Sequence, residues 1–199
     1  MDVYHPEYHV DARPLAPRAA SQRNGGMSAV EFVPLADVDD DLLAAIEEGR
    51  GWIPNVFLVL LHSPALASGW LTLANALRAS SLDLRTRELA ILLVAHVKDS
   101  SYEWGVHERV ARSAGVTDAE LAAIRAWPDR AGWSRRDWAV LTLVAAVAAN
   151  EPAPSSCLDE LRQEGARFTV ELAGTSAYYV AVAQFTKALQ VPVDAPALG

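Results

Sequence analysis

The sequence predicts an all-α protein, and three observations support this fold class. Apolar residues recur at helical spacing through most of the chain, and residues that cap helices stand before many of these stretches. Alternation of apolar and polar residues, which is typical of half-buried strands, is scarce. The chain has 199 residues, of which 51% are hydrophobic, so it can bury a core as one domain or as two small fused halves.

Proline and aspartate mark the helix starts in the first half of the chain. Pro54 and Pro64 can each occupy the first turn of a helix, where the missing backbone N–H costs nothing. Asp83 is a good N-cap for an apolar stretch that Asp99 and Ser100 interrupt. We expect helices over residues 39–48, 55–62, 64–79 and 83–98.

Capping residues also divide the second half. Ser100 can open a helix that ends at Gly115, and Thr117 with Glu120 has the spacing of a capping box. Residues 127–133 are predicted to form a loop, after which Ser134 caps a long apolar helix. We expect these helices over 100–115, from 117 onward, over 134–150, from 155 or 156 to 165, and over 168–190.

Residues 1–26 are predicted to be an N-terminal arm and residues 27–199 the helical domain. The arm combines three prolines with a turn-rich end at 22–26, so it is either a frayed tail or a segment that wraps a neighbouring subunit.

Composition limits the classes of partner. A net charge of −8 without a basic run argues against nucleic-acid binding. The longest apolar runs are too short to span a bilayer, and the acidic, proline-containing start does not resemble a signal peptide, so we expect a cytoplasmic protein. Cys157 is the single cysteine, which excludes an intrachain disulfide and any thiol pair within one chain.

Two parts of the chain are weakly similar to each other. Residues 70–74 resemble 138–143, and a Glu-Leu-Ala sequence follows each of them, at 88–90 and 171–173. An internal helical duplication and chance similarity of apolar helices both explain this pattern. In a duplication, Thr186 and Gln190 would replace Glu103 and His107, so the second copy would lack the polar groups of the first.

Glu88, Glu103 and His107 form the one group of titratable residues within apolar surroundings. Glu103 and His107 are four residues apart and share a helix face, and antiparallel packing through the short connection at Asp99 would bring Glu88 to His107. A partly desolvated carboxylate beside an imidazole can exchange a proton near neutral pH. We therefore interpret the three residues as catalytic.

Simpler roles for these residues stay open. Glu103 has the capping-box position relative to Ser100, Glu88 could pair with Arg85 or with an arginine on another helix, and His107 could lie on a solvated turn. A metal site made from the three residues is not favoured, because the chain has no tight cluster of histidine, cysteine and aspartate. Two further histidines are more typical of satisfied core or rim residues: His62 and His96.

The motif resembles the carboxymuconolactone decarboxylase/AhpD-like superfamily. The resemblance rests on Arg87-Glu88-Leu89 before an apolar helix, then Tyr102-Glu103-Trp104 and His107 with Ala111 and Gly115, and it extends over about residues 35–194. It implies an AhpD-like helical bundle and a homo-oligomer, such as a dimer, trimer or hexamer.

In the AhpD branch, the helix that bears His107 would begin with a Cys-x-x-Cys pair, and this sequence has Ser100 and Glu103 there. A helix N-terminus makes a cysteine a reactive thiolate, but serine is no comparable nucleophile and a carboxylate cannot form a disulfide. We therefore expect no thiol-dependent peroxidase activity, and a peroxidase-like oxidoreductase is disfavoured.

The decarboxylase branch implies acid–base chemistry without a redox-active cysteine. We expect a cofactor-independent lyase or isomerase that acts on a small carbonyl, lactone or polyketide-like substrate, without a metal. A non-catalytic ligand-binding or scaffold protein with the same fold is the alternative. The residues expected to contact the substrate are Tyr102, Trp104, His96 and Arg85.

Overall fold

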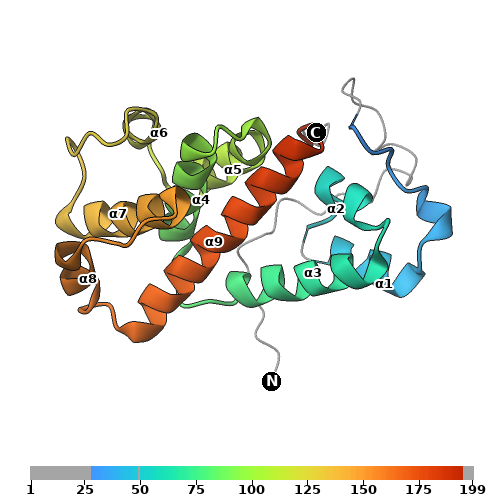
Figure 1. Ribbon diagram of the computed structural model, residues 1–199, viewed down its shortest axis with the longest axis horizontal. Coiled ribbons are helices and arrows are strands. Elements are labelled where there is room, and N and C mark those ends of the chain that lie inside the picture. The colour runs from blue at the N-terminus through green and yellow to red at the C-terminus, as the bar shows by residue number, and fades with distance from the viewer. Residues whose placement is uncertain (1–27, 49, 195–199) are drawn as a thin grey trace. The chain divides into compact units, whose positions relative to one another are not determined.

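A computed structural model describes residues 28–48 and 50–194, so the predicted arm at 1–26 lies outside the described residues. All regular secondary structure in the described part is helical, with nine α-helices and one 3-10 helix (Figure 1). The predicted all-α class is confirmed. Among the described residues, no helix is long and apolar enough to cross a membrane.

The described residues form two compact units. The first contains the residues up to Ala79 together with those from Ala188 onward, and the second contains Ser80–Lys187. All three residues of the predicted catalytic group belong to the second unit.

The first unit contains the short 3-10 helix η3 (Leu35–Asp37) and the helices α1 (Asp40–Glu47), α2 (Asn55–Leu60) and α3 (Pro64–Arg78). Asp39 caps α1, and Pro64 occupies the first turn of α3, as predicted. Helix α2 ends two residues earlier than predicted. The backbone N–H groups of His62 and Ser63 donate to carbonyls three residues back, which tightens the chain into a turn before Pro64.

The second unit contains the remaining helices, and their caps agree closely with the sequence pattern. Asp83, Ser100 and Ser134 each accept a hydrogen bond at an N-terminus, and Thr117 with Glu120 forms a complete capping box. Helix α8 begins without the predicted serine cap, since Pro154 is its N-cap. The helices are α4 (Leu84–Val97), α5 (Ser101–Ser113), α6 (Asp118–Arg125), α7 (Arg135–Ala149), α8 (Ser155–Leu161) and α9 (Ala166–Ala188).

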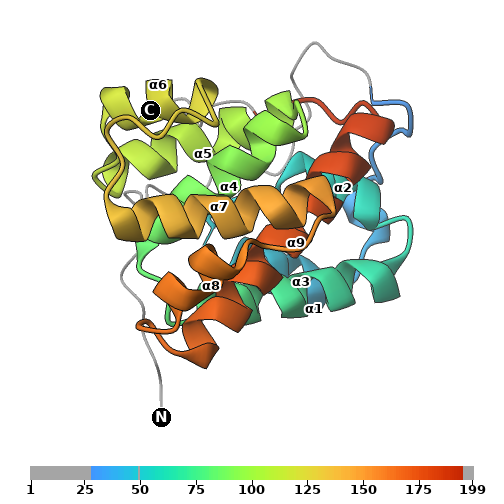
Figure 2. The same ribbon diagram turned by 60° about the vertical axis from the view of Figure 1, so that its left-hand side comes forward.

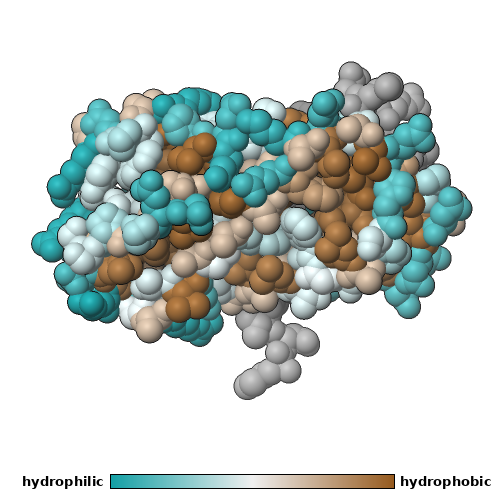
Figure 3. Space-filling model, viewed as in Figure 1, coloured by the Kyte–Doolittle hydropathy of each residue, from teal (hydrophilic) through white to brown (hydrophobic). Residues whose placement is uncertain are grey.

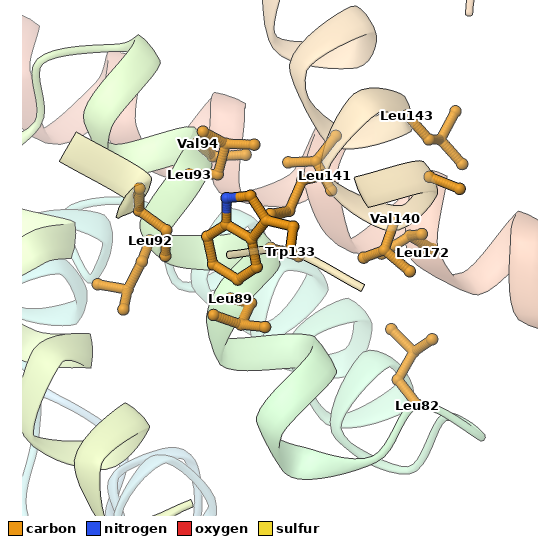
Figure 4. Close-up of a cluster of buried hydrophobic side chains, with 14 of the residues drawn as sticks. Leu82, Leu89, Leu92, Leu93, Val94, Trp133, Val140, Leu141, Leu143 and Leu172 are labelled. Atoms are coloured by element: carbon orange, nitrogen blue, oxygen red, sulfur yellow. The ribbon is translucent and has the colours of Figure 1, made fainter. Parts of the chain in front are cut away.

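Helix α4 is the centre of the second unit. Every side chain from 86 to 95 is buried, because α5, α6 and α7 all pack against this helix (Figure 2). Leucines of α4 and α7 surround the indole of Trp133, which fills the middle of the apolar cluster (Figure 4). Burial on all sides explains why α4 has no polar stripe in the sequence.

The connection between α4 and α5 is as short as two helices allow. Asp99 has a left-handed backbone with φ of 50°, and its N–H donates to the carbonyl of His96 at 3.1 Å. The N–H of Ser100 donates to the carbonyl of Ala95 at 2.8 Å, which completes a Schellman motif. The same Ser100 then caps α5, so one residue ends one helix and begins the next.

Helix α9 runs parallel to α4, because bonds near both ends join them in the same order. The backbone N–H of Ser81, just before α4, donates to Glu171 at 2.8 Å. Just after α4, Asp99 pairs with Lys187 at 2.9 Å. The two bonds span 90 and 88 positions of sequence, so the residues that flank α4 lie beside residues of α9 about 89 positions later.

Truncation of a side chain in the centre of α4 tests how far the fold depends on this helix. Leu93 is fully buried, so we expect Leu93→Ala to lower the free energy of unfolding by about 2–5 kcal/mol. Chemical denaturation followed by circular dichroism measures the loss. Leu73→Ala is the matched control, since Leu73 is 49% exposed and its truncation should cost about 1 kcal/mol or less. Equal losses for the two variants would contradict the central position of α4.

Candidate functional site

A hydrogen bond between Glu88 and His107 joins α4 to α5. The Nδ1–H of His107 donates to Oε2 of Glu88 over 2.7 Å. The Glu88 side chain is completely buried, whereas the His107 side chain is 11% exposed. An ionised carboxylate can only accept, so the bond places a proton on Nδ1 and turns Nε2 toward the remaining part of the site.

Glu103 lies on the other side of the same imidazole. Its Oε2 is 3.6 Å from Nε2 of His107, one turn along α5, and its side chain is 2% exposed. This distance is too long for a hydrogen bond but short enough for strong electrostatic attraction. The structure therefore brings together all three residues that the sequence predicts as catalytic, with the imidazole between two carboxylates.

The simpler roles of Glu103 and His107 do not fit this geometry. Ser100 does cap α5 by accepting from the N–H of Glu103 at 3.3 Å. The N–H of Ser100 already donates to Ala95, so it does not need the Glu103 carboxylate that a capping box would supply. The interpretation of His107 as a residue on a solvated turn is wrong, because its ring is buried between helices.

The two arginines at the start of α4 have different surroundings. Arg85 forms ion pairs with Glu120 of α6 and with Asp137 of α7, the second at 3.2 Å, so its charge is already balanced. Arg87 is 2% exposed, and its Nε lies 3.8 Å from Oε1 of Glu88. The arginine next to the carboxylate of the site is thus Arg87, and the structure does not support pairing of Glu88 with Arg85.

Three other predicted substrate contacts have distinct positions. Tyr102 is buried on α5, and His96 is partly exposed in the last turn of α4. Trp104 donates its indole N–H to Glu108 at 2.7 Å, and the Arg125 guanidinium lies 4.1 Å from the ring centre. Trp104 thus contacts charged residues of α5 and α6.

Sequence reasoning missed one residue that touches the site. The ring of Tyr179 on α9 packs edge-on against His107, with 5.1 Å between the centres and 88° between the planes. Tyr178 makes a similar contact with Tyr179 at 5.2 Å. Aromatic residues so far along the chain carry no local signal of contact with α5, so only the register of α9 could have identified Tyr179.

The charges around His107 decide its protonation. Burial of the ring opposes a positive charge, but the charge and hydrogen bond of Glu88 and the charge of Glu103 outweigh this effect. The Arg87 guanidinium also opposes protonation, more weakly than the other groups. The net effect raises the pKa of His107 above its ordinary value of 6.5, which favours the imidazolium at neutral pH.

Neither a metal cluster nor a reactive thiol accompanies the site. Within the described ranges, no three histidine, cysteine, aspartate or glutamate side chains are arranged to hold a metal ion. Cys157 lies buried on α8, with Sγ 3.1 Å from the carbonyl of Ala139. Burial raises the pKa of this thiol, so it is a poor nucleophile.

Residues 64–146 match the model of the carboxymuconolactone decarboxylase family. The matched stretch begins with α3, ends in α7 and includes Glu88, Glu103 and His107. The predicted resemblance is thereby confirmed. No curated protein matches the chain in sequence.

Solved structures share the fold of this chain. An alkylhydroperoxidase AhpD core protein, peroxidase-related, from Ralstonia eutropha is 18% identical, with a TM-score of 0.73, over 86% of this chain and 94% of its own. A variant of the debrominase Bmp8 bound to 2,3,4-tribromopyrrole is 15% identical, with a TM-score of 0.69, over 82% and 90%. A peroxidase-related protein from a Silicibacter species is 17% identical, with a TM-score of 0.70, over 84% and 92%. These likenesses establish the AhpD-like fold.

Replacement of Glu88 by its neutral isostere tests the charge coupling. We expect Glu88→Gln to lower the pKa of His107, because it removes the nearest negative charge while it keeps an acceptor. The pKa is read from the imidazole C–H resonance that is missing in His107→Ala. Glu108→Gln is the control, since Glu108 pairs with Arg112 instead.

The same variant changes how stability depends on pH. The raised pKa means that the folded protein retains the His107 proton to higher pH than the unfolded chain does. This stabilisation is complete below the unfolded value near 6.5 and is lost as pH rises through the folded pKa. Unfolding measured across this window should show a fall in stability for the natural chain and a smaller fall for Glu88→Gln. An unchanged His107 pKa in Glu88→Gln would contradict the coupling.

Proposed function

We propose that the protein is a cofactor-independent lyase or isomerase that transfers protons on a small carbonyl, lactone or polyketide-like substrate. The observation that carries this proposal is the imidazole held between two buried carboxylates, with its Nδ1 bound to one of them. The family contains enzymes by its very name, which supports catalysis in general but does not specify this reaction.

His107 is the proton donor in this proposal. Glu88 fixes the ring through Nδ1 and favours the imidazolium, so the proton on Nε2 is the one available to a substrate. The His107 side chain is also more exposed than the side chain of Glu88 or Glu103, at 11% against 0% and 2%. A substrate would therefore meet the imidazole first.

Glu103 is the proton acceptor. Its carboxylate can take a proton from the carbon next to a carbonyl group, and the electron pair of that C–H bond then moves to the carbonyl oxygen. His107 delivers its proton to this enolate at oxygen, or, in a substrate with a C=C bond conjugated to the enolate, at the far carbon of that bond, which shifts the double bond. In a decarboxylation, the C–C bond to the substrate carboxylate breaks and CO2 leaves. The electron pair of that bond forms the enolate, which His107 then protonates.

The ion pairs of Arg85 limit how a substrate can be bound. Arg85 is bound to Glu120 and Asp137, so the proposal no longer assigns it to a substrate carboxylate. The structure of the debrominase Bmp8 holds a brominated pyrrole within the same fold, which supports a small cyclic ligand for this chain as well.

Thiol redox chemistry has no counterpart in this site. The Ser100 hydroxyl accepts the N–H of Glu103 and so serves as a helix cap. Cys157 has a raised pKa and lies on a different helix, α8. Peroxide turnover through a cysteine is therefore not part of the proposal.

Exchange of substrate hydrogen for deuterium tests the proton transfer without knowledge of the product. A panel of lactones, unsaturated ketones and β-keto esters is incubated with the protein in heavy water and followed by NMR. We expect catalysed exchange or turnover of at least one compound, and a loss of about 10²- to 10⁴-fold in His107→Ala and in Glu103→Gln.

The controls are variants of the same types at exposed positions. His62 binds the Glu31 carbonyl and Glu151 is exposed, so His62→Ala and Glu151→Gln should retain full rates. Full activity of both site variants on an accepted substrate would refute the assignment. Compounds that bind near His107 with no exchange and no turnover would instead support a ligand-binding protein.

A homo-oligomer is also part of the proposal. Large apolar side chains are exposed on three helices: Leu66 and Leu73 on α3 are each 49% exposed, Val97 on α4 is 37% exposed and Val170 on α9 is 70% exposed. Figure 3 shows apolar residues mixed with hydrophilic ones on one face of the molecule. We expect gel filtration at micromolar concentration to give a multiple of 21.5 kDa, and a species of 21.5 kDa alone would contradict the proposal.

A further inference from the structure

The hydroxyl of Thr175 is buried on α9 and has no hydrogen-bond partner among the residues that the structure describes. Its residue is 0% exposed, and its Oγ1 makes no hydrogen bond within the described part of the chain. The hydroxyls of the other serine and threonine residues of α9 each bond back to the carbonyl four residues earlier. These bonds are Thr169 to Gly165, Ser176 to Leu172 and Thr186 to Val182. Thr175 is thus an exception within its own helix, and a buried hydroxyl without a partner is costly.

The register of α9 places Thr175 at the level of the candidate site. The residues that flank α4 lie beside residues of α9 about 89 positions later, as the bonds at Ser81 and Asp99 show. Interpolation between these two bonds places Glu88 near the level of Ala177, two residues from Thr175. Thr175 also precedes Tyr179 by one turn on the same helix face, and Tyr179 contacts the His107 ring.

One carboxylate oxygen of Glu88, like the Thr175 hydroxyl, is buried without a hydrogen bond to the described residues. Oε2 of Glu88 accepts from His107, but Oε1 is buried and makes no hydrogen bond to residues 28–48 or 50–194. The Nε of Arg87 lies 3.8 Å from this Oε1, which is too long for a direct bond. A fully buried carboxylate oxygen needs a donor, since its desolvation is otherwise uncompensated.

We propose that one buried water molecule links the Thr175 hydroxyl to Oε1 of Glu88, which makes Thr175 a positioning residue for the Glu88–His107 pair. A buried water molecule requires two to four polar partners, and these two groups supply two of them. The water molecule donates to the carboxylate and bonds to the hydroxyl, so both groups are satisfied at once.

This link would adjust the proton affinity of the site. A donor to Oε1 withdraws negative charge from Glu88 and so weakens its hold on the His107 proton. The other groups that face His107 are Arg87 from α4, Glu103 from α5 and Tyr179 from α9, and none of them changes in a Thr175 variant. Thr175 would therefore change the proton affinity of His107 through Glu88, without a direct contact with His107.

The test compares Thr175→Val, which removes the hydroxyl and keeps the shape, with the natural chain. We expect the apparent pKa of the His107–Glu88 pair, followed through the imidazole resonance, to rise by about one pH unit, a tenfold change in proton affinity. Thr175→Ser keeps the hydroxyl and should restore the original value. Ser176→Ala is the matched control, because this adjacent buried hydroxyl bonds within its own helix and its loss should leave the pKa unchanged.

A Thr175 hydroxyl without any link predicts the opposite pattern. Thr175→Val would then remove an unsatisfied group, so stability would rise and the His107 pKa would stay the same. This result would overturn the proposal. If the valine variant does not fold, a crystal structure of the natural chain decides, since the link requires density for one oxygen within about 3 Å of both atoms. The proposal concerns the site of the proposed function, but the titration uses no substrate, so the link and the reaction can fail separately.

Discussion

The hydrogen bond between Glu88 and His107 makes it possible to bury a charged group in the middle of α4. A carboxylate enclosed by three packed helices would ordinarily take up a proton or destabilise the fold, because burial of an unpaired charge is expensive. The imidazole of α5 supplies both a donor and a compensating charge at 2.7 Å. The packing of α4, the orientation of α5 and the chemistry of the site all depend on this one contact.

The local features of the fold could be predicted from the sequence because they depend on neighbours along the chain. Asp83, Ser100 and Thr117 cap the helices that the pattern assigns to them, and the four-residue spacing of Glu103 and His107 places both on one face. Helix ends were less predictable. Helix α2 stops early, because backbone bonds to carbonyls three residues back tighten the chain before Pro64.

Contacts between distant helices could not be predicted. Helix α4 is buried all round, so its apolar pattern does not show which of Arg85 and Arg87 faces the carboxylate. Arg85 turned out to join α6 and α7, and Arg87 lies against Glu88. Tyr179 and Thr175 reach the level of the site through the register of α9, which is fixed by bonds at its two ends rather than by any short motif.

Ser100 ends the Schellman motif of α4 and caps α5, so the joint between these helices contains no residue that is free to adjust. Each α-helical residue turns the chain by about 100°. An insertion of one residue in this joint would therefore rotate α5 by more than a quarter turn and direct the imidazole away from α4. Relatives that conserve the paired groups should vary in length everywhere except here, and the joint should be the least tolerant site in the chain for a peptide tag or a circular permutation.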